Sequence, residues 1–205
     1  MRILTLDSAG YASNSYLIID DLSKKFAVVD PSTDTSAAMP LLNDGYQLEY
    51  VLLTHGHFDH ILFVDEWRAL GAKVCLHEGD AEFLGDPSKS LYLQFFARDT
   101  KHKDADILLH DKSIIKLGDN IIKVLSTPGH TKGSVCFIFD NIMVSGDTLF
   151  EGSIGRTDLY GSSPADMQES IEKLSTIKED YTVYPGHGGK TTLMFEKKYG
   201  GYLHS

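Results

Sequence analysis

The sequence predicts an α+β fold in which two mixed layers of strands and helices pack into one domain. Three observations support this prediction. Strands, a helix and a further strand follow one another in the first half of the chain, and strands, a helix and a strand recur in the second half. No Ser/Pro-rich linker or low-complexity run divides the 205 residues. Apolar residues make up 42% of the chain, which is enough for a buried core.

The first half contains five predicted strands and two predicted helices. Short apolar runs predict strands at residues 2–6, 14–19, 26–30, 50–54 and 73–76. The first three are typical of a β meander, and the run at 50–54 is apolar enough for a strand buried on both faces. Helical spacing indicates helices at residues 35–43 and 58–70, which Gly45 and Gly71 end.

The second half repeats this style after a looser segment. Apolar runs predict strands at residues 113–116, 121–126, 135–139, 142–145 and 181–184. Asp140-Asn141 is a candidate tight turn, and Pro164 starts a predicted helix at 164–176. Residues 85–111 form either a partly helical connection over a site or a packed surface loop. Within them, the stripe of Leu91, Phe95 and Phe96 is more typical of core than of a substrate pocket.

Charge and cysteine content narrow the classes of function. The net charge is -10, which argues against a nucleic-acid-binding surface. The N-terminal apolar patch is too short for a signal peptide, and no stretch reaches the length of a membrane span. We therefore expect a cytoplasmic protein without nucleic-acid or membrane partners. Cys75 and Cys136 are expected to be buried free thiols, and the oligomeric state stays open.

Residues 55–60 read His-Gly-His-Phe-Asp-His, directly after the predicted buried strand. For this composition, a His-x-His pair followed by Asp and His at the same spacing is expected about 0.002 times by chance. Imidazole nitrogen and carboxylate oxygen are ligands that suit zinc and iron. The motif therefore predicts a metal site.

Three later motifs also place a His or Asp just past a predicted strand end, beside glycine. They are Gly129-His130, Gly146-Asp147 and Gly186-His187. A strand end is a rigid mount, and glycine lets the backbone turn sharply and approach closely. Together with the motif at 55–60, four strand ends can deliver ligands to one edge of a sheet.

These residues form two sets of metal ligands with a shared member. The first set is His55, His57 and His130, the second is Asp59, His60 and His187, and Asp147 bridges them. We expect two divalent ions, zinc first, although iron and manganese also suit these ligands. Two metals about 3.5–4 Å apart can share a hydroxide and hold it against an electrophilic carbon.

The order of these motifs resembles the metallo-β-lactamase superfamily along essentially the whole chain. The resemblance implies an αββα sandwich, the metallo-β-lactamase-like fold, with the metals at one edge of two packed mixed sheets. Residues 1–205 would then form a single domain of this kind.

Within that superfamily, residues 146–150 (Gly-Asp-Thr-Leu-Phe) and 152–158 (Gly-Ser-Ile-Gly-Arg-Thr-Asp) resemble the glyoxalase II branch. The branch hydrolyses S-2-hydroxyacylglutathione thioesters, typically S-lactoylglutathione. Arg156 falls where the branch often has a basic residue near the thiol moiety, which implies a substrate contact. The alternative is that Arg156 pairs with Asp158 and fixes its loop. Asp147 disfavours a true β-lactamase, in which the resembling position usually holds Cys or Ser.

The chain departs from full-length glyoxalase II in two places. Only residues 188–205 follow the last predicted ligand, so we expect the C-terminal helical domain that helps to bind glutathione to be absent. Gly188-Gly189 replaces a tyrosine that usually follows the last Gly-His motif. The chain therefore resembles the short, single-domain bacterial type.

The leading hypothesis is hydrolysis of a small-molecule thioester by a metal-bound hydroxide formed near neutral pH. Asp59 and Asp147 are the predicted catalytic carboxylates: Asp59 orients the hydroxide, and Asp147 bridges the metals. The metal at the three-histidine set polarises the carbonyl oxygen. A thiolate leaves readily, so no dedicated general acid is required.

Two other enzyme classes stay open. Persulfide dioxygenases, which are oxidoreductases, resemble the same branch and use one iron held by two histidines and one carboxylate. Here that set would be His55, His130 and Asp147. The Ser153-Ile154 step resembles the hydrolase more closely. A metal-dependent esterase or lactonase would use the same nucleophile as the thioesterase.

The remaining candidate residues have structural interpretations. His77 is expected to be a core or capping histidine, and Asp30 a structural turn residue. His102, His110 and His204 are expected at the surface.

Overall fold

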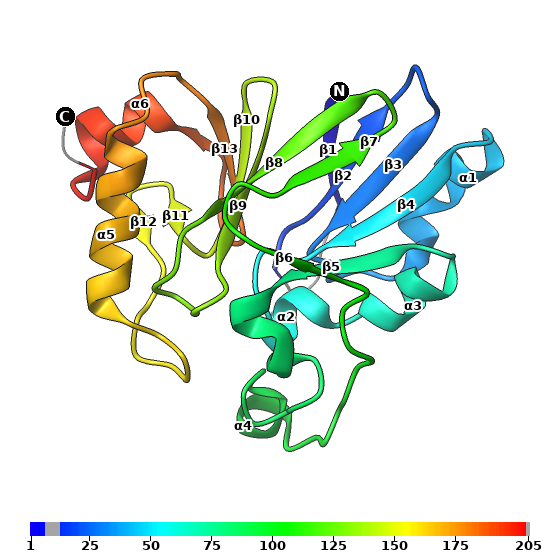
Figure 1. The fold of residues 1–205 in the computed structure, drawn as a ribbon, viewed down its shortest axis with the longest axis horizontal. Coiled ribbons are helices and arrows are strands. Elements are labelled where there is room, and N and C mark those ends of the chain that lie inside the picture. The colour runs from blue at the N-terminus through cyan, green and yellow to red at the C-terminus, as the bar shows by residue number, and fades with distance from the viewer. Residues whose placement is uncertain (7–12, 204–205) are drawn as a thin grey trace.

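The computed structural model describes residues 1–6 and 13–203, and within these ranges the chain forms two six-stranded sheets (Figure 1). The first has the order β1-β2-β3-β4-β5-β6, with bounds Arg2–Leu6, Ser15–Asp20, Lys25–Val29, Gln47–Leu52, Lys73–His77 and Ile107–Leu109. The second has the order β14-β13-β10-β9-β8-β7, with bounds Thr191–Thr192, Thr182–Pro185, Ile142–Gly146, Val135–Phe139, Asn120–Ser126 and Ile114–Leu117. A small hairpin pairs β11 (Leu149–Phe150) with β12 (Ser153–Ile154).

Both sheets mix antiparallel and parallel pairs. Strands β1 to β3 form the predicted meander, whereas β3 to β6 run parallel. In the second sheet β7 to β10 are antiparallel and β13 joins β10 in parallel. Phe139 pairs with Ile142 across the two-residue turn predicted at Asp140-Asn141, where Asp140 has φ 48°. Ten of the twelve strands in the two sheets overlap the predicted runs, whereas β6 and β14, of three and two residues, were not predicted.

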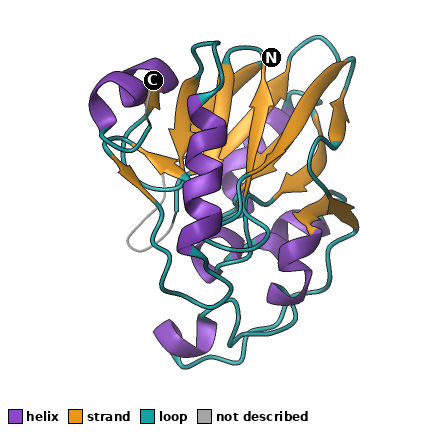
Figure 2. Ribbon diagram, turned by 60° about the vertical axis from the view of Figure 1, so that its left-hand side comes forward, coloured by secondary structure: helices purple, strands orange, loops and turns teal. Residues whose placement is uncertain are grey.

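The helices lie on the outer faces of the two sheets. The first half contributes a 3₁₀ turn at Thr35–Ala38, α1 (Met39–Asn43), α2 (Phe58–Ile61), α3 (Val64–Ala69), a 3₁₀ segment at Glu78–Phe83 and α4 (Tyr92–Phe96). The second half contributes α5 (Pro164–Ser175), α6 (Leu193–Phe195) and a π-helical turn at Glu196–Gly200. Figure 2 shows α5 lying along the strands. Within the described ranges, no helix combines the length and the apolar character needed to cross a membrane.

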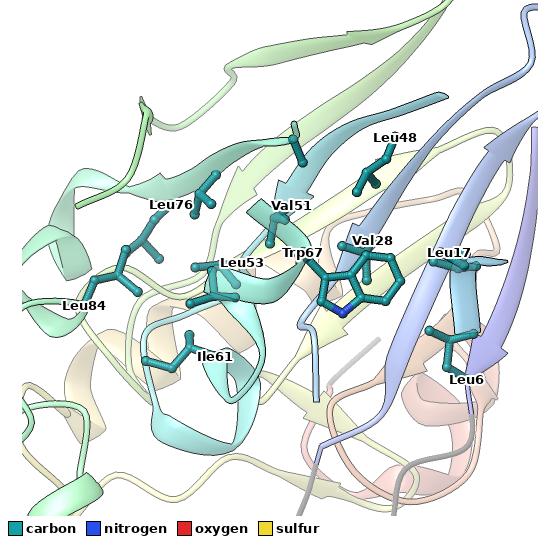
Figure 3. Close-up of a cluster of buried hydrophobic side chains, with 14 of the residues drawn as sticks. Leu6, Leu17, Val28, Leu48, Val51, Leu53, Ile61, Trp67, Leu76 and Leu84 are labelled. Atoms are coloured by element: carbon teal, nitrogen blue, oxygen red, sulfur yellow. The ribbon is translucent and has the colours of Figure 1, made fainter. Parts of the chain in front are cut away.

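Period-two alternation divides the buried side chains among three layers of core. On β2, Leu17 and Ile19 face the helices, whereas Ile18 faces the second sheet. The helix-side cluster surrounds Trp67 and Ile61 (Figure 3). A third cluster packs α5 against the second sheet through residues that include Met167, Ile171 and Leu174. Because each sheet is buried on both faces, the predicted αββα sandwich is confirmed.

The predicted helix over residues 58–70 is wrong in one respect, since it is two helices. The carbonyl of Asp59, which a continuous helix would pair with the N–H of Phe63, instead accepts hydrogen bonds from Ser13 and Ser32. Phe63 donates its N–H to the carbonyl of Pro31 at 3.0 Å. The chain therefore turns between α2 and α3, and the helical spacing of the apolar residues gave no sign of this competition.

Several single-residue predictions are settled by the fold. Cys75 and Cys136 are buried free thiols, as predicted. His77 caps the Glu78–Phe83 segment by accepting the N–H of Gly79 at 3.1 Å, and His110 is exposed. The surface prediction is wrong for His102, whose side chain is 6% exposed. His204 lies outside the described residues.

Candidate metal centre

The ends of four strands deliver the predicted ligands to one edge of the two sheets. β4 leads to His55 and His57, with Asp59 and His60 on α2 just beyond, while β8 leads to His130, β10 to Asp147 and β13 to His187. The structure brings all seven together, and we call them the His/Asp cluster. Donor atoms within 4.8 Å of one another form three triads: His55-His57-His130, His55-His60-Asp147 and Asp59-His60-His187. The first and the third are the two sets predicted from the sequence.

The carboxylate of Asp147 lies between the two sets. Its Oδ1 is 3.4 Å from Nε2 of His60, and its Oδ2 is 3.5 Å from Nε2 of His130 and 3.6 Å from Nε2 of His187. Nε2 of His187 is also 3.1 Å from Oδ2 of Asp59. One carboxylate thus faces both sets, which is the arrangement a bridging ligand needs.

The tautomer of His60 follows from its contact with Asp30. The Asp30 carboxylate can only accept hydrogen bonds, so Nδ1 of His60, 2.9 Å away, is the donor. Asp30 also accepts the backbone N–H of Thr54 at 2.8 Å and its hydroxyl at 2.7 Å. The proton of His60 is therefore on Nδ1 whenever the ring is neutral, and the lone pair of Nε2 points into the cluster.

Hydrogen bonds to Nδ1 also determine the tautomers of two other histidines of the cluster, His55 and His130. Since the hydroxyl of Thr54 donates to Asp30, its oxygen accepts from Nδ1 of His55 at 3.2 Å. Nδ1 of His130 donates to the backbone carbonyl of Arg156 at 2.9 Å. Both rings therefore turn a bare Nε2 toward the cluster, as metal-binding histidines do when an outer partner holds their other nitrogen.

The cluster contains buried polar atoms that the described protein does not satisfy. Nε2 of His55, His57 and His60 and Oδ1 of Asp147 have no hydrogen-bond partner within the described residues. An unsatisfied buried group costs about 1–3 kcal/mol, so four in one place need compensation. A divalent cation accepts lone pairs from imidazole nitrogen and carboxylate oxygen at once, and the donor set therefore fits zinc, iron or manganese.

The pKa shifts agree with a site shaped for positive charge. Burial lowers the pKa of His57 to about 3, aided by His130, and burial with neighbouring imidazoles holds the pKa of His55 well below its ordinary range. Burial also lowers the pKa of His60, but the nearby carboxylates, Asp30 foremost, outweigh it and raise that pKa well above its ordinary value. Burial opposes ionisation of Asp147, yet the charge of His60 keeps its pKa below the ordinary range. The first set thus offers neutral imidazoles, whereas the imidazoles of the second set, His60 and His187, have raised pKa values and lie beside ionised carboxylates.

Asp30 is a site residue that the sequence interpretation missed. We expected a structural turn residue, and the structure instead places its fully buried carboxylate behind His60 and, through Thr54, behind His55. The signal was present, because Asp30 directly follows β3 in the same way that the ligands follow their strands. Its φ of 48° aims it at the loop after β4.

Asp80 is a second missed residue, and its sequence context gave no signal. Its Oδ2 accepts the N–H of Gly56 at 2.9 Å and the hydroxyl of Thr131 at 2.7 Å, and its Oδ1 accepts the N–H of Gly133 at 2.7 Å. Burial raises its pKa to about 6 although all three hydrogen bonds favour ionisation. Asp80 therefore ties the loop after β4 to the loop after β8, and so holds the histidines of the first set together.

Two glycines let the backbone pass close to the cluster. A Cβ on Gly186 would lie 2.1 Å from Oδ1 of Asp147, and one on Gly56 would lie 2.4 Å from Cβ of Phe83. Real Cβ atoms are not found at such distances, so any larger residue would displace its neighbour. The glycines predicted to allow close approach are thus required at both positions.

A cavity of about 630 Å³ opens onto the cluster. Its lining consists of His57, Phe58, Asp59, Leu91, Phe95, Phe96, His130, Asp147, Phe150, Arg156, Leu159 and His187. The prediction that the stripe in the 85–111 segment belongs to the core is wrong for Phe95 and Phe96, which are 52% and 40% exposed. Helical spacing could not distinguish a core face from a cavity wall. α4 is the part of the segment that lies over the site.

Arg156 makes the loop-fixing contact and also lines the cavity. Its guanidinium contacts Asp158 through two hydrogen bonds of 2.6 and 2.7 Å, which is the loop-fixing alternative. The side chain also lines the cavity, where a substrate contact would occur. Its carbonyl, which holds His130, is a third role that no side-chain pattern could signal.

Comparisons with known proteins match this geometry. A family model described as the Metallo-beta-lactamase superfamily matches residues 9–187. A Bacillus subtilis protein described as "Probable metallo-hydrolase YqgX" is 33% identical over 196 residues, which cover 93% of this chain and 92% of that protein.

Solved structures extend the similarity to the whole fold. The BLEG-1 B3 metallo-beta-lactamase superposes with a TM-score of 0.90 at 32% identity and covers 100% of both chains. TTHA1623 in a di-iron-bound form superposes with a TM-score of 0.81 at 28% identity, and the match covers 99% of this chain and 100% of that one.

Proposed function

The chain belongs to the metallo-beta-lactamase superfamily, and on that premise we propose that it is a binuclear metallohydrolase that cleaves thioesters. The superfamily relationship supports an enzyme with a divalent-metal site, and the His/Asp cluster supplies the donors for one. S-2-hydroxyacylglutathiones such as S-lactoylglutathione, which the sequence resemblance implies, are the reference substrates.

Two metals are supported by the two donor sets. His55, His57 and His130 would hold the first, Asp59, His60 and His187 the second, and Asp147 would contribute to both. Bound divalent ions lower the pKa of water and polarise a carbonyl oxygen. The related TTHA1623 structure holds two irons, so the count of two has a precedent at 28% identity, while zinc remains our first choice of metal.

The protein's own groups would position the reactants. Hydrogen bonds to Asp30, to Thr54 and to the carbonyl of Arg156 each fix the orientation of one imidazole ring. These rings belong to His60, His55 and His130, respectively. Asp59 lines the cavity with a carboxylate oxygen 3.1 Å from Nε2 of His187, where it can accept a hydrogen bond from a water and orient it. The remaining wall consists of apolar side chains, which would limit the number of other water molecules around a bound substrate.

One observation favours a thioester over an oxygen ester or an amide. Apart from members of the His/Asp cluster, the only polar side chain in the described cavity lining is Arg156, which is permanently charged. The lining thus offers no separate general acid to protonate a leaving group. A thiol has a pKa of about 8.5 and leaves as thiolate, whereas an alkoxide or an amide nitrogen needs a proton.

The direct test compares a thioester and an oxygen ester that share the same acyl group and differ in the leaving group. Metal-loaded protein is given S-lactoylglutathione and, in parallel, an oxygen ester of lactate, and released thiol or acid is followed. We expect thioester turnover that a chelator abolishes. This turnover should exceed oxygen-ester turnover by about 100-fold, because a general acid usually accelerates departure of a poor leaving group by at least that factor and the described lining offers none. Equal rates would contradict the argument from the leaving group. Turnover of other thioesters without S-lactoylglutathione would contradict the glutathione assignment alone.

A further inference from the structure

The cavity wall beside the His/Asp cluster is aromatic on one side. Phe58, which precedes the cluster residue Asp59, has its ring centroid 5.1 Å from that of Phe95 and 5.2 Å from that of Phe96. The plane of the Phe58 ring makes an angle of 31° with that of Phe95 and is nearly perpendicular, at 83°, to that of Phe96. Phe95 and Phe96 are nonetheless 52% and 40% exposed, so that much of each ring's surface stays uncovered where it lines the cavity.

The helix that carries this wall is fixed in place. Leu91 and Ala97 flank α4 at φ 70° and 52°, a left-handed conformation that side-chain-bearing residues rarely adopt without tertiary support. The hydroxyl of Tyr92 lies 3.1 Å from Nε2 of His102, whose Nδ1 lies 2.8 Å from Asp65 on α3. These contacts hold α4 against the layer that carries α2. The wall is therefore formed before any ligand arrives, which reduces the cost of binding one.

The cavity offers few partners for a ligand that carries two carboxylates. Glutathione carries two carboxylates and one ammonium group at neutral pH, and the described lining contains one permanently cationic side chain, Arg156. Asp158 already occupies that guanidinium through both oxygens. An anion at this position would have to share or displace Asp158.

From this wall we propose that the substrate carries an uncharged apolar group, an alkyl chain or a phenyl ring, bound against Phe58, Phe95 and Phe96. The inference rests on the proposed thioester hydrolysis and specifies the class of thioester. The apolar group can belong to the acyl or to the thiol half, because both halves extend from a carbonyl held at the cluster. A phenyl ring would make the offset and edge contacts that aromatic pairs favour.

The test begins with a series of N-acetylcysteamine thioesters on metal-loaded protein. Each fully buried methylene is worth about a factor of four, so four added methylenes that are even half buried raise kcat/KM more than tenfold. We therefore expect hexanoyl and phenylacetyl thioesters to exceed the acetyl thioester by at least about tenfold. S-hexyl thioacetate, compared with hexanoyl-N-acetylcysteamine, shows which half carries the apolar group. Rates that do not depend on chain length on either half would overturn the inference while leaving thioester hydrolysis intact.

A variant and a matched control locate the effect. In the double variant Phe95→Ala/Phe96→Ala, the ratio of hexanoyl to acetyl kcat/KM should fall to less than about threefold, because most of the apolar contact is removed. Phe195→Ala is the control: Phe195 is 47% exposed and stacks on Tyr199 at 5.1 Å, yet it does not line the cavity. The control should keep the wild-type ratio. An unchanged ratio in the double variant would place the apolar site elsewhere and overturn the assignment.

A binding measurement separates this inference from the proposed function. The inert thioethers S-hexyl- and S-ethyl-N-acetylcysteamine are titrated calorimetrically into metal-free protein. We expect the hexyl compound to bind at least about tenfold more tightly, with a negative heat-capacity change that the double variant reduces. Tight hexyl binding without hydrolysis of any thioester would contradict the proposed reaction but support the apolar wall. Equal binding of the two thioethers would overturn the wall as a substrate site.

Discussion

Replacing Asp30 with Asn should weaken metal binding although Asp30 is not itself a member of the His/Asp cluster. The change is nearly isosteric, but it converts one carboxylate oxygen into an NH₂ donor. The backbone N–H of Thr54, 2.8 Å from Oδ1, requires the remaining amide oxygen. The NH₂ group then faces Nδ1 of His60 at the position of Oδ2, 2.9 Å away, so two donors oppose each other.

The size of the effect follows from the two ways in which Asp30→Asn can relax. If His60 moves its proton to Nε2, the lone pair that faces the cluster is lost. If the amide turns over instead, the N–H of Thr54 is left buried without a partner, which costs about 1–3 kcal/mol. In the first case, with NH₂ at the position of Oδ2, the hydroxyl of Thr54 also loses its acceptor, and with it the arrangement that holds His55. We expect metal affinity to fall about 10- to 100-fold, the usual loss for a partner of a metal-binding histidine, or about 1.4–2.8 kcal/mol.

The assay is competition for zinc between the protein and a chelating dye, with thermal unfolding of the metal-free protein measured alongside. Asp20→Asn is the matched control, since Asp20 is also a buried carboxylate that accepts a backbone N–H and a hydroxyl, from Leu22 and Ser23, but in the turn after β2. The control should lose stability without losing zinc affinity. If Asp30→Asn bound zinc within twofold of the wild type while the side chain at position 30 still contacted His60, the tautomer argument would be refuted.

Three further perturbations have defined outcomes. Gly186→Ala places a methyl group 2.1 Å from Oδ1 of Asp147, so the variant should bind about one metal fewer per chain, as measured by elemental analysis. Gly85→Ala is the control, since its Cβ meets nothing closer than 3.8 Å, and it should retain both metals. Asp80→Asn sets an NH₂ group against N–H and hydroxyl donors and should lower the free energy of unfolding by about 1–3 kcal/mol in denaturant titrations; no change would mean that the two loops are held independently. The pKa of His187 is raised chiefly by its hydrogen bond to Asp59, and neighbouring carboxylates raise the pKa of His60, so a metal must displace protons from both rings. Apparent zinc affinity should therefore increase with pH through these raised pKa values and fall in acid, and a flat profile across pH 5–8 in the dye competition would contradict this.

The sequence was sufficient for elements whose pattern is local. Short apolar runs located most strands to within a few residues, because inner strands such as β2 and β3 are buried on both faces between layers. The break between α2 and α3 was not local: Ser13 and Ser32 take the carbonyl of Asp59 from distant parts of the chain. A helical pattern cannot report a competitor of that kind.

The site residues likewise fall into those that a local sequence pattern reveals and those that depend on distant contacts. The seven members of the His/Asp cluster could be grouped from the sequence because ligand types followed strand ends beside glycine. Asp30 follows a strand in the same way, but its role depends on contacts with His60 and Thr54, 30 and 24 residues away, which a local pattern does not reveal. Asp80 could not be found, since its role consists of hydrogen bonds to backbone and hydroxyl groups 24 and about 50 residues away. The exposure of Phe95 and Phe96 depends on the cavity, which exists only in the folded chain.

A single titration addresses the proposed enzyme most directly. Metal-free protein receives zinc in increments, and initial thiol release from S-lactoylglutathione and from hexanoyl-N-acetylcysteamine is measured at each step. We expect turnover of at least one thioester to rise up to two equivalents of metal per chain and then level off. Full activity at one equivalent would contradict the binuclear site and indicate that a single zinc ion is sufficient for hydrolysis. No thiol release from either substrate at two equivalents would contradict the thioesterase itself.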